Sequence, residues 1–421
     1  MTPEIKQRIA QIQRGEVPEG YKRVGHNVIP KSWKRANFDQ VATIRSGLVS
    51  PKEEPYLSMY HIGPDNIEKD TGRINSVKTA SELGLISGKF YFDTSSIVYS
   101  KIRPNLNKIC APNFEGICSA DCYSIQPNKG MDKIYLLNLM LSHEFYKRAV
   151  ACSMRTGMPK INQDDLNVIP LIVSDDIKEQ QNIAAILTTQ DKIIELKEKL
   201  LAEKQHQKKY LMQQLLTGKK RLPGFGGTWK KEILGKCASM CSGGTPDTNN
   251  EKYYGNDYIW ISIKDMTSAG KYTCSSKRGL TEAGFLNCSA RLFPKGTILF
   301  AMYASIGECS IAEVECCSSQ AILGIEPDSK LNNEFLYYLL SNSKGYFKSF
   351  GQASSQPNLN KGIVQSIVVQ IPTIEEQAAI VEVLSAADRE IDLLRRDIEQ
   401  EKQKKKALMQ LLLTGVVRVK T

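Results

Sequence analysis

The most constraining feature of this 421-residue chain is an internal repeat. When residues 179–218 are placed over residues 376–415, a shift of 197 without a gap, sixteen of the forty positions are identical. The identities include Glu179-Gln180 with Glu376-Gln377, and the Leu-Leu-Thr-Gly sequences that end both copies. Because self-similarity at a fixed shift marks a repeat architecture, the chain is expected to contain one helical unit twice.

Both copies are expected to be long helices. In the second copy, apolar residues recur at alternating four- and three-residue steps, which is the a/d pattern of a coiled coil. They are Ile380, Leu384, Ala387, Ile391, Leu394, Ile398, Leu408 and Leu412. The first copy has a matching stripe but carries Gln190, Lys197 and Lys204 on the same track. We expect the two helices to pair antiparallel. Two separate amphipathic helices would explain the stripe but not a repeat in register.

A weaker repeat covers the blocks before the helices. Trp33-Lys34 matches Trp229-Lys230, and residues 159–162 (Pro-Lys-Ile-Asn) match residues 357–360 (Pro-Asn-Leu-Asn). In each block, short β-rich runs precede one helical stretch, so both are expected to be α+β modules and not βαβ nucleotide-binding folds.

The two repeats together predict the domain organisation. The fold class is α+β, with two repeated α/β domains separated by two long helices that form an antiparallel coiled coil with pseudo-twofold symmetry. The predicted segments are an N-terminal helix completing the distal helical region (1–20), a first domain (21–175), a central helix (176–221), a second domain (222–372) and a C-terminal helix (373–421).

Motifs for catalysis are absent from the sequence. It has no phosphate loop of the Gly-x4-Gly-Lys-Ser/Thr type, no dinucleotide-binding glycine pattern and no His-Glu-x-x-His. The eleven cysteines show no zinc-ligand spacing, and they are expected to be reduced thiols in a cytoplasmic protein. No apolar run approaches the ~18 residues that span a bilayer. We therefore expect a protein that binds and does not react, with no catalytic residue, no metal and no membrane.

The net charge of +11 favours a polyanionic partner. Two loops of the first block combine cations with amides, at residues 100–108 and 155–162, and the second block has more neutral polar loops at equivalent points. Arg, Asn and Gln can read base edges, Lys meets phosphate, and Gly lets backbone N–H groups approach phosphate. Each loop taken alone also fits an ordinary solvated turn. The candidate nucleic-acid-binding residues are Arg45, Lys101, Arg103, Asn105, Asn107, Lys108, Arg155, Lys160, Asn162, Ser242, Gly243, Thr245, Tyr303, Ser305, Gln356, Asn358, Asn360 and Lys361.

The pattern resembles the specificity (S) subunit of type I restriction-modification systems. The residues that carry the resemblance are Glu375-Glu376-Gln377, the Leu-Leu-Thr-Gly helix ends, Gly243-Gly244-Thr245-Pro246, residues 99–104 (Tyr-Ser-Lys-Ile-Arg-Pro) and residues 116–121 (Gly-Ile-Cys-Ser-Ala-Asp). The likeness extends over essentially the whole chain. The first helix departs from it, with Lys178 in place of the first Glu and a more polar seam.

The resemblance implies that the two blocks are target-recognition domains, each reading one half of a split site in double-stranded DNA. It implies that the paired helices set the gap between the halves and dock two modification (methyltransferase) subunits. The chain itself would hold no cofactor, because S-adenosylmethionine, ATP and Mg would belong to the modification subunits and to ATP-dependent restriction subunits. The alternative from another class is a two-headed coiled-coil adaptor that binds proteins.

Overall fold

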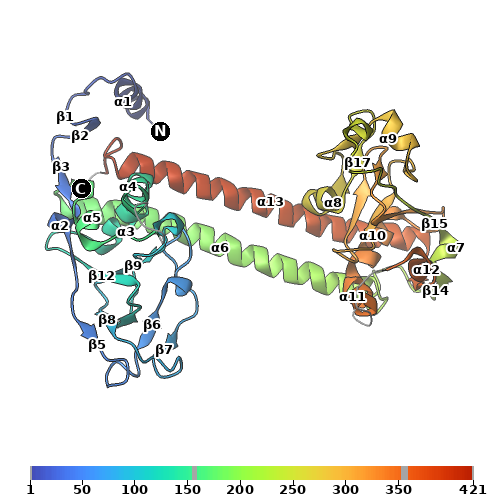
Figure 1. Cartoon of the computed structure of the whole chain (residues 1–421), viewed down its shortest axis with the longest axis horizontal. Coiled ribbons are helices and arrows are strands. Elements are labelled where there is room, and N and C mark those ends of the chain that lie inside the picture. The colour runs from blue at the N-terminus through green and yellow to red at the C-terminus, as the bar shows by residue number, and fades with distance from the viewer. Residues whose placement is uncertain (1, 154–158, 352–358, 420–421) are drawn as a thin grey trace. The chain divides into compact units, whose positions relative to one another are not determined.

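The structure is a computed structural model that describes residues 2–153, 159–351 and 359–419. The chain forms two compact units (Figure 1). The first unit consists of residues 1–198 and 397–421, and the second unit consists of residues 199–396. Each long helix therefore contributes one part to each unit.

The first unit begins with a short helix and continues as a strand-rich domain that ends at the first long helix. Its helices are α1 (Pro3–Gln13), α2 (Phe38–Val41), α3 (Lys133–Leu141), α4 (His143–Ser153), α5 (Gln163–Asn167) and the start of α6 (Ile177–Leu215). Its strands are β1 (Tyr21–Val24), β2 (Asn27–Pro30), β3 (Trp33–Asn37), β4 (Ala42–Ile44), β5 (Leu48–Val49), β6 (Tyr60–Ile62), β7 (Lys78–Thr79), β8 (Lys89–Phe92), β9 (Ile97–Ser100), β10 (Ile109–Cys110), β11 (Gly116–Cys118), β12 (Cys122–Pro127) and β13 (Pro170–Ser174).

The second unit begins at the equivalent of β3, and it has two additional short helices before its central strands. Its helices are α7 (Leu234–Cys237), α8 (Ile263–Ala269), α9 (Glu282–Leu286), α10 (Asn333–Asn342), α11 (Lys344–Gly351), α12 (Lys361–Gln365) and most of α13 (Ile374–Leu412). Its strands are β14 (Lys230–Ile233), β15 (Ala238–Ser242), β16 (Tyr254–Gly255), β17 (Trp260–Ile261), β18 (Tyr272–Thr273), β19 (Gly279–Leu280), β20 (Ile298–Ala301), β21 (Cys309–Ala312), β22 (Cys317–Ser318), β23 (Ile322–Pro327) and β24 (Val368–Ile371).

The sheets have the same central plan in both units. In the first unit the order β10-β9-β12-β4 lies beside a second sheet of order β5-β8-β11-β6-β7, and in the second unit the main sheet has the order β15-β23-β20-β21-β18. In each unit an antiparallel ribbon joins the start of the block to its end, as β3 with β13 and as β14 with β24. The main cores contain α3 and α4 in the first unit and α10 in the second. The α+β expectation is met in both blocks.

The long helices meet inside each unit through ion pairs whose register runs antiparallel. In the first unit Asp191 pairs with Lys405 at 2.6 Å, and Lys197 pairs with Asp397 at 2.8 Å. In the second unit Lys204 pairs with Glu390 at 2.7 Å. Two polar residues predicted on the helix seam, Lys197 and Lys204, thus have acidic partners across it. The fuller prediction, one continuous coiled coil with pseudo-twofold symmetry, stays a prediction.

The predicted helix ends and the N-terminal helix are also in place. Gly218 and Gly415 follow the two long helices with φ of 67° and 72°, the left-handed conformation expected of a glycine C-cap. Beside the second of these ends, Tyr21 donates a hydrogen bond of 2.9 Å to the carbonyl of Gly415, and the guanidinium of Arg8 on α1 lies 5.3 Å from the Tyr21 ring centroid. Among the described residues, no helix is long and apolar enough to cross a membrane.

Candidate nucleic-acid interface

In the first unit, backbone hydrogen bonds join the two loops that were predicted to bind nucleic acid, at residues 100–108 and in the described part of 155–162. The N–H of Lys101 donates to Asp121 at 2.9 Å, in the turn between β11 and β12. The N–H of Arg103 then donates to Pro159 at 2.8 Å, and the N–H of Ile161 donates to Lys101 at 2.9 Å. Residues 101–103 and 159–161 therefore form one surface at the end of β9, although some 55 residues separate them in the chain.

This joined surface presents cations that have no acidic partner within the described part of the chain. Arg103 and Lys160 are exposed. Lys101 is half-buried, and its ammonium lies 5.2 Å from the ring centroid of Tyr123. Burial, and then the nearby charge of Lys160, lower the pKa of Lys101, an effect that Asp121 partly opposes. An anion bound here would relieve the repulsion between the two lysines.

Three of the predicted contacts in the first unit have polar groups that other residues of the protein already engage, and their role in DNA binding stays a prediction. Asn107 is only 5% exposed and donates a hydrogen bond of 3.1 Å to Asp70. The ammonium of Lys108 donates to the carbonyl of Pro64 at 2.6 Å. Arg45 forms an ion pair with Asp93, which precedes β9, whereas Lys101 follows that strand.

Two amides of this region keep an exposed position. Asn105 is exposed beside Arg103. Asn162 is exposed as well, and its side-chain oxygen accepts a hydrogen bond of 2.7 Å from the N–H of Asp165, which makes it the N-cap of α5. Arg155 lies outside the described residues.

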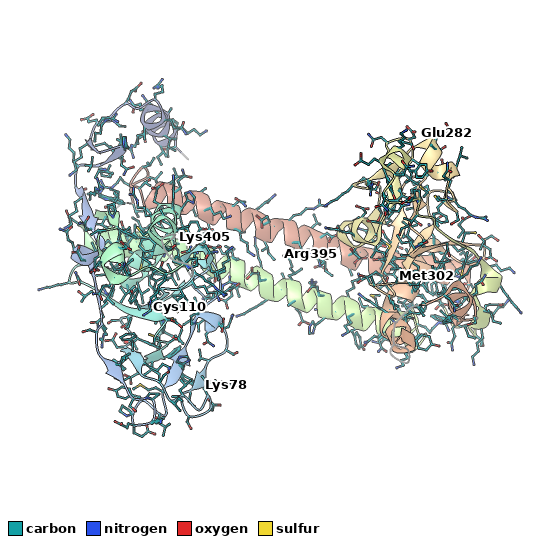
Figure 2. The ribbon with its side chains drawn as sticks, viewed as in Figure 1. Lys78, Cys110, Glu282, Met302, Arg395 and Lys405 are labelled. Carbon is teal, nitrogen blue, oxygen red and sulfur yellow. The ribbon has the colours of Figure 1, made fainter. Side chains whose placement is uncertain are left out.

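The second unit builds the equivalent surface with neutral residues. The N–H of Met302 donates to Ala321 at 2.9 Å, as Lys101 does to Asp121, and the N–H of Leu359 donates to Met302 at 3.1 Å. Two positions further on, Ala304 has φ of 54°, and the matching Arg103 has φ of 48°. Met302 and Ala304 therefore occupy the places of Lys101 and Arg103. Figure 2 labels Met302, which is 3% exposed.

The glycine loop of the second unit packs against protein and does not offer its amides to a ligand. The N–H of Gly243 donates to Ile322 at 3.0 Å, and the N–H of Gly244 donates to Ser318 at 2.9 Å. A Cβ atom on Gly243 would lie 2.2 Å from the carbonyl oxygen of Ser318, so only glycine fits there. The approach of Gly243 to phosphate stays a prediction, and in this structure its N–H already donates to a protein carbonyl.

The remaining candidates of the second unit line the same end of its sheet. Ser242 ends β15 and is partly exposed, and Thr245 accepts a hydrogen bond of 3.3 Å from the N–H of Gln320. Asn360 is exposed and caps α12, in the way that Asn162 caps α5. The other described candidates are the partly exposed Tyr303 and Ser305 and the exposed Lys361. Gln356 and Asn358 lie outside the described residues.

The role of the repeated Glu-Gln pair becomes visible only in the structure. The carboxylate of Glu179, at the start of α6, accepts hydrogen bonds from the indole of Trp33 at 2.8 Å and from Nη2 of Arg418 at 3.0 Å. The next residue, Gln180, accepts a hydrogen bond of 2.7 Å from the N–H of Asp132, which caps α3. This Trp-Glu-Arg clamp holds the first domain on its helix.

The second unit contains the same clamp at the start of α13. Glu376 accepts two hydrogen bonds of 2.6 Å from Arg221 and one of 3.3 Å from the indole of Trp229. Gln377 accepts one of 2.8 Å from the N–H of Asn332. Arg221 and Arg418 are themselves related by the shift of 197, but they lie three residues beyond the aligned helix ends. Extending the repeat by three residues would have found them.

A comparison with protein-family models matches the type I restriction modification DNA specificity domain twice, at residues 30–204 and 227–403. The chain belongs to this family. The two matches cover most of the chain, and each includes one α+β block with part of the long helix that follows it.

Relatives of known name agree with this assignment. The chain is 40% identical to the type I restriction enzyme EcoDI specificity subunit of Escherichia coli, over 40% of its own length and 35% of that protein. It is 25% identical to the putative MjaX specificity subunit of Methanocaldococcus jannaschii over 96% and 98% of the two chains. The first alignment thus spans about a third of the EcoDI subunit.

The fold is also shared with solved structures. A chain from a type I restriction-modification assembly aligns with a TM-score of 0.64 at 20% identity, covering 92% of this chain and 99% of that one. The S subunit from M. genitalium aligns with a TM-score of 0.57 at 15% identity, covering 95% and 99%. At these identities the likeness concerns the fold.

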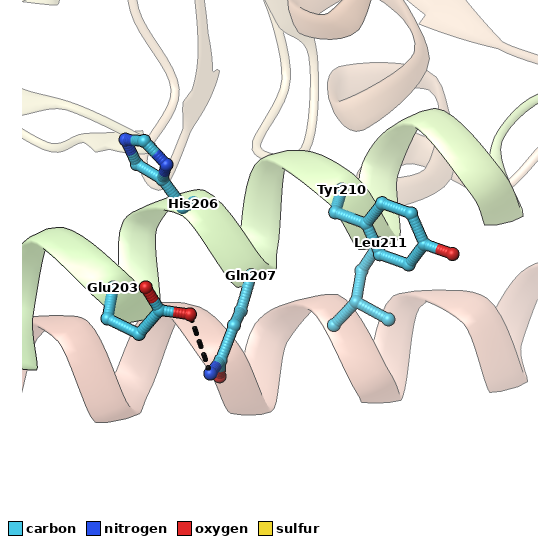
Figure 3. A pocket seen from close by; sticks show the side chains of 5 residues that line it. All are labelled: Glu203, His206, Gln207, Tyr210 and Leu211. Atoms are coloured by element: carbon cyan, nitrogen blue, oxygen red, sulfur yellow. Dashed lines mark hydrogen bonds between the residues drawn. The ribbon is translucent and has the colours of Figure 1, made fainter.

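The lining of an open hollow on this specificity-domain protein comes from a single helix. Figure 3 shows an open hollow whose lining side chains, Glu203, His206, Gln207, Tyr210 and Leu211, all come from α6. The contact drawn there is a hydrogen bond of 3.4 Å from Gln207 to Glu203, and it creates no nucleophile with a base. The described residues include no group of three or more His, Cys, Asp or Glu side chains that could hold a metal ion.

Proposed function

We propose that this chain is the DNA sequence-recognition subunit of a type I restriction-modification complex, and that each domain reads one half of a bipartite target. The observation that carries the proposal is the presence of two specificity domains in one chain. Each has polar loops at one end of its sheet. The loops are equivalent in backbone but different in side chains, as expected of two modules that read different sequences.

We propose that the long helices set the distance between the two half-sites and dock two modification subunits. Leu196 and Leu393 occupy the same position of the helical repeat and are 55% and 64% exposed. Covering such a leucine with a partner removes apolar surface from water and favours binding. Because the shift of 197 relates Leu196 to Leu393, the two leucines offer two equivalent docking points, which supports two modification subunits per chain.

The chemistry belongs, in this proposal, to the partners. S-adenosylmethionine would be bound by the modification subunits, and ATP with Mg by restriction subunits, all acting with this chain on double-stranded DNA in the cytoplasm. The purified chain alone is expected neither to methylate nor to cleave DNA. Turnover that survives in a preparation free of partner subunits would contradict this.

The test is binding selection with the chain assembled on its modification subunits. A library of random duplexes should yield two short defined sequences at a fixed separation, and binding should weaken steeply with salt because the partner is a polyanion. Salt-insensitive capture of a protein, with no selected DNA sequence, would favour the two-headed adaptor instead.

A further inference from the structure

The second domain must recognise its half-site without the cations that the first domain presents at the end of its sheet. Met302 and Ala304 replace Lys101 and Arg103 at the matching backbone positions. Neither residue offers a side-chain hydrogen bond to a base edge. The donors equivalent to Lys101 and Arg103 are therefore missing here, and another part of the second unit can supply them.

One arginine beside the glycine loop has suitable geometry. The guanidinium of Arg278 lies over the ring of Tyr254, 3.3 Å from its centroid. The hydroxyl of Tyr254 donates a hydrogen bond of 3.1 Å to the carbonyl of Pro246. The indole of Trp260, in ring contact with Tyr254 at 6.1 Å, donates one of 2.9 Å to Gly244. Tyr254, with Trp260 packed edge-to-face against it, therefore supports both Arg278 and the loop at residues 243–246.

The hydrogen-bond donors of Arg278 are available to a ligand. The residue is exposed, and no described carboxylate lies within ion-pair distance of it and no described acceptor takes its protons. Stacking on the ring fixes the plane of the guanidinium, so its N–H edge is oriented before any ligand binds. An oriented fork of two donors matches the O6 and N7 acceptors of guanine in the major groove. A flexible ammonium lacks the fixed plane of that fork.

We propose that Arg278 is a specificity-determining residue of the second domain and reads a guanine in the half-site that this domain binds. The inference rests on the proposed DNA-recognition function and adds to it a base and a residue. Tyr254 is the positioning residue, because it acts through Arg278.

The experiment uses the chain assembled with its modification subunits and compares the wild type with Arg278→Ala, Arg278→Lys and Lys277→Ala. Lys277 is the matched control, since it is the exposed neighbouring cation with no side-chain contact among the described residues. Selected sequences, and affinities for the wild-type target across a salt series, are measured for each. Thermal melting of each complex checks folding, which the exposed position of Arg278 should leave intact.

Both Arg278 variants should lose the preference for one guanine in one half-site and bind the original target about 5- to 150-fold more weakly. Lys277→Ala should keep the selected sequence. Arg278→Ala that keeps the selected sequence, or that weakens binding to all sequences equally, would overturn the proposal, since either result shows that Arg278 contacts no base. Failure of the Arg278 proposal would not contradict the proposed DNA-recognition function. That function is contradicted only if the wild-type complex selects no bipartite DNA sequence.

Discussion

Removing Arg418 should loosen the first unit and leave the second unit unchanged. Glu179 is fully buried, and Arg418, whose side chain is 38% exposed, binds both of its carboxylate oxygens. Losing one partner of a buried ion pair costs about 3–5 kcal/mol. Because Arg418 is partly solvated, and because Trp33 and Ser174 still donate to the carboxylate, we expect Arg418→Ala to cost about 2–3 kcal/mol.

The measurement is amide hydrogen exchange followed by mass spectrometry, which reports the stability of each segment separately. A loss of about 2–3 kcal/mol corresponds to exchange about 30- to 150-fold faster in β3 and β13 of the first unit. The equivalent strands β14 and β24 serve as an internal control and should not change. Arg221→Ala should give the reverse pattern. Faster exchange in both units, or in neither, would refute the role assigned to the clamp.

The effect should depend on pH. Burial by itself raises the pKa of Glu179, but hydrogen bonds from Arg418, Ser174 and Trp33 outweigh it, so the pKa lies below its ordinary value. A carboxyl with a lowered folded-state pKa stabilises the protein above its unfolded pKa of about 4.3 and loses that contribution as the pH falls through the folded value. The difference between wild type and Arg418→Ala should therefore be full near pH 7 and shrink below about pH 4.

Three further predictions concern DNA and the helices. In the assembled complex, Arg103→Ala should weaken DNA binding by about 1–3 kcal/mol and relax the base preference at one position of one half-site. Lys160→Ala should weaken binding to all sequences alike and reduce the slope of log affinity against log salt concentration by about one. Unchanged DNA binding by both variants would remove this surface from the interface. Four residues inserted after Leu200 should add ~6 Å of helix and lengthen the gap between the two unchanged half-sites by one or two base pairs. A well-folded insertion variant that keeps the original gap would exclude the helices as the spacer. Leu393→Glu should weaken binding of a modification subunit in a titration without altering the helix pair, and unaltered affinity would exclude this docking point.

The order of domains and long helices could be predicted from the sequence, because the repeat extends over forty helical residues and over the two blocks that precede them. The hydrophobic period and the register of the repeat predicted two α+β domains and antiparallel pairing of the long helices. Within each unit, an α+β domain and antiparallel ion pairs between the helices are found. The N-caps of α5 and α12 also repeat, because an asparagine before a short helix satisfies its first N–H groups whatever the rest of the fold does.

The individual contact residues were harder to predict, because a loop sequence does not show which of its donors are already used. Asn107 and Gly243 have the right chemistry for DNA, but partners distant in sequence take their hydrogen bonds. The sequence around Arg278 does not indicate a binding residue, because the orientation of its guanidinium comes from Tyr254, twenty-four residues away. In both cases tertiary contacts decide what a polar side chain is free to do.

Two domains in one chain, each reading one half of a DNA site, should leave a bipartite methylation pattern. The decisive measurement maps methylated bases across the genome of cells that carry this chain with its modification subunits, in the wild type and in Arg103→Ala. We expect one bipartite motif with a fixed gap in the wild type, and a change confined to one half in the variant. A single uninterrupted motif, a change in both halves, or methylation that persists without this chain would contradict it.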